Sequence, residues 1–426
     1  MQYNVWFFGI VLGVFLMWKL DLIVTLLNLK SLGDPIPVEL AGVVDAEAYA
    51  KSQDYTREKA VLGIGEGIFT LLVLFVFWWL GGFGWLDEKV RAFAEVRGWR
   101  GTSGMIFTGI CYIGLLVVAL QLLAVPFDLY RTFGIEERYG FNQTTFATWC
   151  LDQGKGAVLG VLLGVPLLAA VLWIFGSVPM AWLWGWLLVT AFSLLLSYVA
   201  PTWIMPWFNR FEPLPDGELK EEIYTMARQC NFPLTDVSVM DGSKRSSKSN
   251  AFFTGFGKNK RIALFDTLIE RHTTAELVAV LAHEIGHYQK KHIIKGMALG
   301  ILTTGAMFLL LGIVLRQPGI YAAFGVKTMS PYVGFVLFAI LFGPVSELLQ
   351  VMSNVISRKH EFEADAYAAE VTGDGAAMGD ALKKLSKNNL SHLTPHPWYV
   401  FWHATHPPVV ERIRAIEAMG AGQVPH

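Results

Sequence analysis

The chain has 426 residues with 34 Lys plus Arg against 35 Asp plus Glu, so its formal net charge is -1. Apolar residues make up 54% of the chain and charged residues 16%, well below the roughly 25% that is usual in a soluble domain. This composition excludes a disordered or collagen-like chain and favours a polytopic membrane protein over a soluble enzyme, while the balanced charge argues against a nucleic-acid partner.

Long windows without charged residues predict the membrane-spanning helices, because about 20 apolar residues are needed to cross the hydrocarbon layer. The first apolar stretch, residues 4–29, contains Lys19 and Asp21 and is predicted to be an uncleaved signal anchor. The charge-free windows that follow cover residues 67–86, 102–127, 156–209, 296–315 and 328–346. A turn signal at residues 176–179 divides the longest window in two, so the sequence predicts about seven spans in a mainly α-helical membrane protein.

The placement of Lys and Arg predicts the orientation of these spans. With seven spans, the loops 30–59 and 131–155, the long segment 210–295 and the tail after residue 358 share one side. Most basic residues of the short loops lie on that side, so we expect it to be cytoplasmic, in either a bacterial inner membrane or the endoplasmic reticulum. The bias is opposed by Lys89, Arg91, Arg97 and Arg100 on the other side. We divide the chain into 1–203 with spans 1–5, 204–292 as an extramembrane segment, 293–356 with spans 6–7, and a C-terminal helical segment, 357–426.

The polar segment 204–292 contains signals for a small hairpin followed by a helix. Residues 250–254 and 261–266 flank a loop with two glycines at 255–259, which is typical of a β-hairpin. Thr273 and Glu276 then form a capping box that starts a helix. The apolar stripe of this helix consists of Leu277, Val280, Leu281 and Ile285.

On that helix the sequence His283-Glu284-Ile285-Gly286-His287 has the HExxH pattern of zinc hydrolases. Residues at i and i+4 share a helix face, so both imidazoles can point at one ion while Glu284 lies beside it. We therefore predict that His283 and His287 bind Zn²⁺ and that Glu284 is a general base. A catalytic zinc normally takes three protein ligands, so one more is needed.

Two candidates for a third ligand close to the HExxH pattern are excluded. The metzincin extension requires Gly at position 290 and His at position 293, where this chain has Lys290 and Ile293. His292 would be turned to the far side of a continuing helix, so we expect it to be solvated or interfacial.

A better candidate lies two spans further on, in residues 357–365, because an even number of crossings returns the chain to the same side. Glu361 and Asp365 share a helix face, whereas Glu363 is turned about 200° from Glu361. One of these carboxylates could bind the metal while its neighbour one turn away accepts the second ring N–H of a ligating histidine. The residues alone leave the choice open, and also allow a merely solvated acidic helix. His406 stands before a pair of prolines in a loop, and the residues alone indicate a structural role for it.

Several segments together resemble the integral-membrane zinc metalloproteases of the CAAX prenyl protease type I family. The matching segments are residues 136–142, 205–211, 249–253, the HEIGH pattern at 283–287, the EFEAD pattern at 361–365, and residues 405–408 with Arg412. The resemblance implies seven long helices enclosing a water-filled chamber that is closed on its cytoplasmic side by a gluzincin-like zinc domain containing the small β-hairpin.

The resemblance also assigns site residues. It selects Glu361 rather than Glu363 as the third ligand, which leaves Asp365 as the carboxylate one turn away. It implies that Asn250 and His406 approach the scissile peptide and stabilise the tetrahedral intermediate, with Arg412 nearby. The family commonly has His-Ser-Asn where this chain has Lys248-Ser249-Asn250, so we expect a changed side-chain preference close to the substrate.

The predicted function is that of an integral-membrane zinc endopeptidase with one Zn²⁺ per chain and, by resemblance, CAAX-type C-terminal processing. Its partners would be the lipid bilayer and a peptide or protein substrate, with prenylation left open. Two alternatives remain: a membrane quality-control protease for misfolded proteins, or a non-catalytic metal-binding or transport protein. Glu284 argues against the latter, because a pure metal binder has no use for a general base there.

Overall fold

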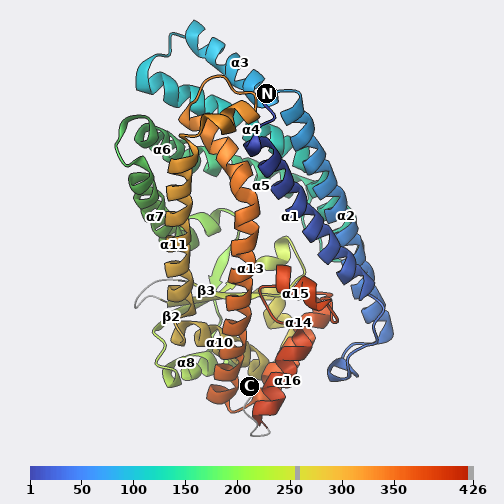
Figure 1. The fold of residues 1–426 in the computed structure, drawn as a ribbon. Coiled ribbons are helices and arrows are strands. Elements are labelled where there is room, and N and C mark those ends of the chain that lie inside the picture. The colour runs from blue at the N-terminus through green and yellow to red at the C-terminus, as the bar shows by residue number, and fades with distance from the viewer. Residues whose placement is uncertain (255–259, 421–426) are drawn as a thin grey trace.

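The computed structural model describes residues 1–254 and 260–420, and within these ranges seven helical segments are long and apolar enough to cross a membrane (Figure 1). This confirms the number predicted from the charge-free windows. The seven segments are Val5–Lys30, Ala46–Trp79, Gly101–Glu136, Phe146–Ser177, Ala181–Trp207, His292–Val314 and Pro331–Thr372.

Several of these segments change helical type along their length. The elements that build them are α1 (Val5–Lys30), α2 (Ala46–Trp79), α4 (Gly101–Leu129), η2 (Tyr130–Glu136), α5 (Phe146–Leu159), η3 (Gly160–Gly164), α6 (Val165–Ser177), α7 (Ala181–Val199), η4 (Ala200–Ile204), η5 (Met205–Trp207), α11 (His292–Val314) and α13 (Pro331–Thr372). The turns η2, η3 and η4 are π-helical, a form that is rare and usually short.

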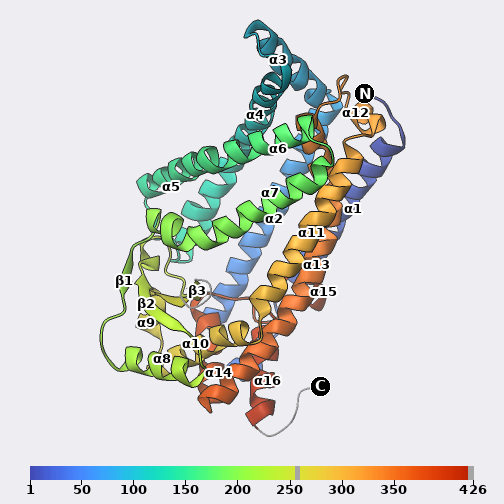
Figure 2. The same cartoon turned by 90° about the vertical axis from the view of Figure 1, so that its left-hand side faces the viewer.

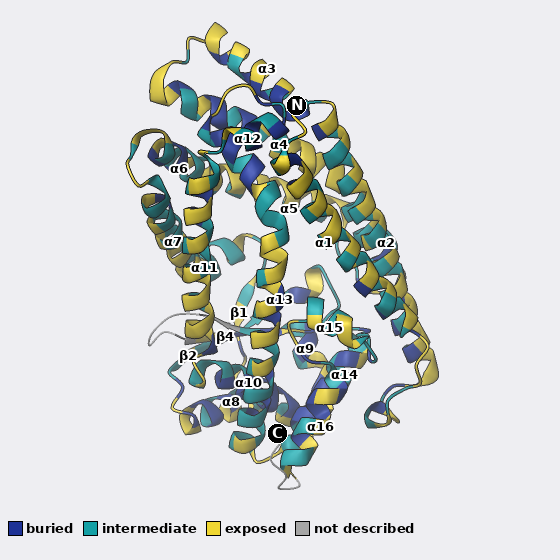
Figure 3. Cartoon of the chain, in the orientation of Figure 1, coloured by how far each residue is buried: buried dark blue, intermediate teal, exposed yellow. Residues whose placement is uncertain are grey.

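Exposed residues recur along the long helices (Figure 3), and many of them are large apolar residues. Leu72 and Val76 on α2, and Val118 and Leu122 on α4, are each at least half exposed. An apolar surface of this extent is typical of helices that face lipid. One charged group within a span has a partner instead: the Glu66 carboxylate of α2 accepts a hydrogen bond of 2.6 Å from Arg131 of η2.

One end of the helices is closed by α3 (Gly82–Val96) and α12 (Pro318–Ala323) (Figure 2). Their apolar core includes Trp78 and Phe324, whose rings stack with centroids 4.1 Å apart. The buried Asp87 accepts hydrogen bonds from Tyr332 and from Arg91. This packing fixes α2, α3, α12 and α13 at the end that also holds the N-terminus.

The opposite end carries a four-stranded sheet with strand order β1-β2-β4-β3. The strands are β1 (Phe211–Pro213), β2 (Leu234–Met240), β3 (Ala251–Thr254) and β4 (Lys260–Phe265). Strands β2 and β4 are parallel, and the other two pairs are antiparallel. The predicted hairpin strands therefore do pair with each other, while the predicted loop at 255–259 lies outside the described residues.

Three helices lie beside this sheet: α8 (Glu218–Gln229), α9 (Asp266–Arg271) and α10 (Thr274–Gln289). The chain also contains two short 3-10 turns, η1 (Val38–Leu40) and η6 (Gly242–Lys244). The predicted capping box is present at the start of α10: the Thr273 hydroxyl accepts from the Glu276 N–H, and the Glu276 carboxylate accepts from the Thr273 N–H. The stripe residues Leu277, Leu281 and Ile285 are buried in one core with the sheet. The packing of this stripe against the sheet determines which face of α10 points away from the sheet.

Helix α13 links the membrane part to this domain as one continuous element. Its 42 residues correspond to about 63 Å at 1.5 Å per residue, roughly twice the thickness of the hydrocarbon layer. Its C-terminal part therefore extends beyond the bilayer and packs against α10. The last helices, α14 (Gly375–Asn388), α15 (Pro397–His403) and α16 (Val409–Gly420), complete the domain.

Candidate metal centre

Helix α10 brings two imidazoles together, as its spacing predicts. His283 is buried and His287 is half-buried, and their Nε2 atoms lie 3.1 Å apart. The rings are nearly perpendicular, with an interplanar angle of 84°. Both Nε2 atoms therefore converge on one point outside the helix.

The third group at this point is Glu361 of α13. Its Oε2 atom lies 3.4 Å from His283 Nε2, and its Oε1 atom lies 3.3 Å from His287 Nε2. Ligands at about 2.0–2.1 Å around a tetrahedral ion are themselves about 3.3 Å apart, which matches these separations. Moreover, the buried Glu361 Oε2 atom makes no hydrogen bond in the described part of the chain. A metal ion fits this donor set.

A close helix contact makes the convergence possible. A Cβ atom built on Gly286 of α10 would lie 3.1 Å from both the Cα and the carbonyl oxygen of Ala364 of α13. A side chain at position 286 would therefore push the two helices apart. Gly286 lies between the two histidines, so this contact sets how near Glu361 comes to them.

A buried ion pair supports His283 from behind. The Asp365 carboxylate lies 2.8 Å from His283 Nδ1. It also accepts two hydrogen bonds from Arg412 of α16, from Nε at 2.7 Å and from Nη2 at 2.6 Å. Burial by itself would lower the pKa of Arg412, but the hydrogen bonds and charge of Asp365, together with the charges of Glu361 and Glu284, raise it above its ordinary value. Arg412 thus contacts Asp365 directly, and its Nη1 lies 3.5 Å from Glu361.

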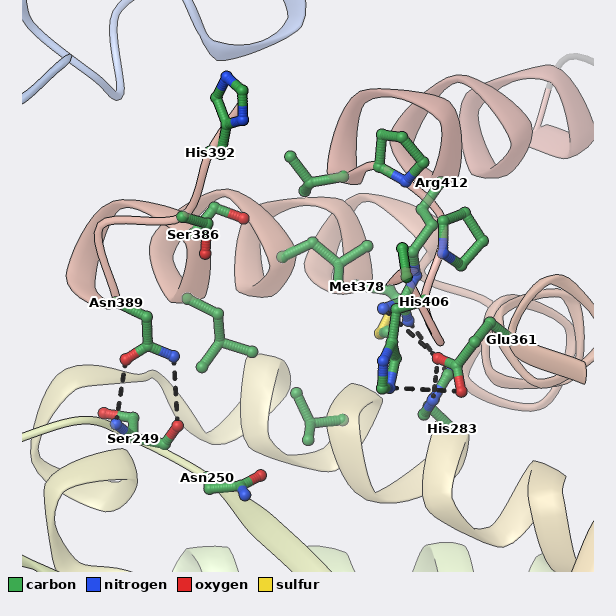
Figure 4. Close-up of a pocket in the computed structure, with 18 of the residues that line it drawn as sticks. Ser249, Asn250, His283, Glu361, Met378, Ser386, Asn389, His392, His406 and Arg412 are labelled. Carbon is green, nitrogen blue, oxygen red and sulfur yellow. Dashed lines mark hydrogen bonds and ion pairs between the residues drawn. The ribbon is translucent and has the colours of Figure 1, made fainter. Parts of the chain in front are cut away.

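A cleft of about 530 Å³ opens in front of these groups (Figure 4). Its walls include Glu284 of α10, Asn250 directly before β3, and His406 in the loop before α16. The His406 Nε2 atom lies 3.5 Å from Glu361, and the Asn250 side-chain oxygen accepts from the Ala251 N–H at 2.9 Å. Burial raises the pKa of Glu284 above its ordinary value, which makes this carboxylate a stronger base than an exposed one.

The loop that carries His406 is tied to α13. The Arg358 guanidinium donates to the carbonyl oxygens of Val400 and Ala404, at 2.9 Å and 2.6 Å. Asn354 donates to the carbonyl of Trp402 at 2.8 Å. These side chains bind carbonyls at and just after the C-terminal end of α15, where most carbonyls lack a partner inside the helix; Val400 also accepts from the Ala404 N–H. One helix thus holds both Glu361 and the segment leading to His406.

Comparison with known proteins agrees with this geometry along nearly the whole chain. Residues 25–210 match the model of the CAAX prenyl protease N-terminal domain with five membrane helices, and residues 213–420 match that of peptidase family M48. The chain belongs to this peptidase family. This membership makes the chain a metalloendopeptidase, and the family implies a metal.

Individual relatives are similar over most of their length. CAAX prenyl protease 1 of Saccharomyces cerevisiae is 36% identical, with 90% of this chain and 88% of the relative covered. The human CAAX prenyl protease 1 homolog is 33% identical, with 90% and 89% covered. The crystal structure of S. mikatae Ste24p matches with a TM-score of 0.90 and 33% identity, covering 98% of this chain and all of that one. This match confirms the expected fold class, a seven-helix membrane protease that encloses a chamber.

Our sequence interpretation of His292 was wrong in its helix geometry, although the interfacial position that it allowed is observed. It assumed that α10 continues, but α10 ends at Gln289, and Lys291 adopts a left-handed conformation with φ of 58°. His292 therefore turns back and is buried, with its Nδ1 atom 3.0 Å from His287 Nδ1. Glu363, the carboxylate left open by the residues alone, lies 2.9 Å from His292 Nε2 rather than at the metal site. No Gly or Pro signals the break at Lys290 and Lys291.

Lys248 also lies elsewhere than we expected. Instead of lining the cleft beside Ser249 and Asn250, its ammonium group donates to Glu136 at 2.8 Å and to the Tyr55 hydroxyl at 2.6 Å. It lies 4.4 Å above the Phe141 ring. The segment before β3 is thereby attached to η2 and α2 of the membrane part, and the side chain faces away from the substrate cleft.

Proposed function

We propose that this protein is a zinc-dependent endopeptidase that removes the C-terminal residues of CAAX proteins. A CAAX terminus is Cys followed by two aliphatic residues and a final variable residue, with the Cys prenylated. The observation that carries the proposal is the tetrahedral spacing of His283, His287 and Glu361 at a cleft that also contains Glu284. The relatives named CAAX prenyl protease 1 support the choice of substrate.

In this proposal the three side chains hold one Zn²⁺ per chain. Zinc, when bound, lowers the pKa of water toward about 7 and polarises the substrate carbonyl. Glu284 accepts the proton of the attacking water and later delivers it to the leaving amine. Asp365 holds the proton on His283 Nδ1 so that Nε2 faces the metal.

We further propose that His406 and Asn250 stabilise the oxyanion that forms on the scissile carbonyl. Both side chains line the cleft and approach it from different segments, His406 from the loop before α16 and Asn250 from the residue directly before β3 (Figure 4). Arg412 acts indirectly in this scheme, by fixing Asp365 and placing positive charge 3.5 Å from Glu361.

The substrate backbone is expected to add a strand to β3, which is the edge strand of the sheet beside the cleft. The Asn250 carbonyl accepts from the Phe265 N–H of β4, so alternation directs the N–H groups of residues 251 and 253 to the open edge. The Ala251 N–H is already bonded to the Asn250 side chain, which leaves the N–H of residue 253 for the substrate. Phe253→Pro, which removes one outward N–H, should raise KM several-fold, whereas Phe253→Ala, which keeps it, should raise KM less. Equal KM values for the two variants would contradict this binding mode.

We infer that the metal centre faces the cytoplasm, on the basis of the basic residues in the loops on its side of the membrane. Labelling of a Glu47→Cys variant by a membrane-impermeant maleimide in intact cells would contradict this orientation, because Glu47 is exposed at the same end as the centre.

We also propose the division of the chain into segments 1–203, 204–292, 293–356 and 357–426. Helix α13 runs without a break through the last of these boundaries.

The decisive experiment compares cleavage of a farnesylated CAAX peptide with that of the same peptide without the lipid. We expect one zinc per purified chain, loss of cleavage on chelation with recovery on adding zinc, and at least a tenfold higher kcat/KM for the lipidated peptide. Tenfold corresponds to about 1.4 kcal/mol, which the burial of about two methylene groups supplies. Equal rates would instead favour a quality-control protease for unfolded chains, and a chain that binds no zinc would contradict the proposal altogether.

A further inference from the structure

The two histidines of the candidate centre are supported in different ways. Asp365 contacts the Nδ1 atom of His283 directly, at 2.8 Å. The Nδ1 atom of His287 instead meets a third imidazole, His292, at 3.0 Å. The far nitrogen of His292, Nε2, lies 2.9 Å from the Glu363 carboxylate. A carboxylate thus reaches each histidine, but at His287 only through another ring.

These contacts allow one arrangement of protons if His287 binds a metal through Nε2. The proton of neutral His287 must then lie on Nδ1, which donates to Nδ1 of His292. His292 accepts there only if its own proton lies on Nε2, and that proton points at the Glu363 carboxylate. Each contact pairs one donor with one acceptor, so the chain of three side chains is fully satisfied.

The surroundings hold the middle ring in place. The His292 side chain is 4% exposed, and the His360 ring stacks on it with centroids 3.9 Å apart and an interplanar angle of 9°. Lys359 lies 3.9 Å from the Glu363 carboxylate. Among the described residues, His360 makes no hydrogen bond to His287 or Glu363, and its contact with the His292 ring is one of stacking.

We propose that His292 and Glu363 are positioning residues of the metal centre, which fix the tautomer and the orientation of His287. This inference rests on the proposed zinc site and adds two residues to it that coordinate nothing themselves. Groups that orient ligating histidines change metal affinity by about 10- to 100-fold when they are removed. We call the hydrogen-bonded series His287, His292 and Glu363 the relay. In this proposal the relay sets the affinity of the protein for its metal.

The test measures zinc dissociation constants of the purified full-length protein by competition with a chelator. His292→Leu removes both hydrogen bonds and should weaken binding about 10- to 100-fold. His292→Asn places an acceptor oxygen near the position of Nδ1 and should recover part of that loss. Glu363→Gln should weaken binding less than His292→Leu, because an amide oxygen still accepts the bond without the negative charge.

The matched control is His360→Phe, which keeps a stacked ring but leaves the relay intact, and its affinity should stay within about twofold of the wild type. Equal affinities of the wild type and His292→Leu would overturn the relay while leaving the zinc site in place. A loss in His360→Phe as large as in His292→Leu would also overturn it, because packing would then explain the effect. A wild-type chain without stoichiometric zinc would instead overturn the proposed metal centre itself.

Discussion

Replacement of Glu284 by Gln is expected to lower kcat about 1,000-fold while the protein keeps its zinc. The amide retains the size and hydrogen-bonding oxygen of the carboxylate but cannot accept the proton of the attacking water, and positioned general bases contribute about 10²- to 10⁴-fold. The three side chains of the candidate centre, His283, His287 and Glu361, are unchanged in this variant. The measurement is the rate of peptide cleavage together with the zinc content of the same preparation.

The control for this exchange is Glu270→Gln, the same chemical change at an exposed position of α9 in the same domain. It should cleave at the wild-type rate. If Glu284→Gln cleaves as fast as the control, Glu284 is not the base. If it loses its zinc, Glu284 contributes to metal binding, and the ligand set must be revised.

Arg412→Leu is expected to have the largest effect on stability. It removes the partner of Asp365, which is fully buried, and leaves that carboxylate as an uncompensated charge beside His283. Breaking a buried ion pair from one side costs about 3–5 kcal/mol. We expect a clear fall in the apparent Tm of the detergent-solubilised protein and weaker zinc retention.

The matched control lies two residues further along α16. Arg414 pairs with Glu39, and its side chain is 63% exposed. Exposed pairs contribute about 0–1 kcal/mol, so Arg414→Leu should change Tm little. The double variant with Asp365→Asn and Arg412→Leu should recover part of the lost Tm, because the uncompensated charge is then absent. Equal Tm values for Arg412→Leu and Arg414→Leu would contradict the assigned importance of the buried pair.

The features that the sequence predicted well are local or depend on length. Charge-free windows are long enough to mark the spans, and the capping box at Thr273 marks the start of α10 without any knowledge of its neighbours. The pairing of β3 with β4 follows from two adjacent strands and a short connection. The HExxH spacing depends only on the turn of a single helix.

Features that depend on how two helices meet could not be predicted in this way. Periodicity places Glu361 and Glu363 on one helix but does not say which face of α13 meets α10, and that phase is set by the contact of Gly286 with Ala364. His292 was misjudged because the helix break at Lys291 has no sequence signal. The ion pair of Lys248 joins residues 112 positions apart, beyond the reach of local patterns.

The continuity of α13 has a consequence for biogenesis. Glu361 reaches His283 and His287 only after the chain has made both of its last two crossings, α11 and α13. In a molecule that failed to insert one of these segments, Glu361 would lie on the opposite side of the bilayer from His283 and His287. A misinserted chain therefore cannot assemble the metal centre, and only correctly inserted molecules become active proteases.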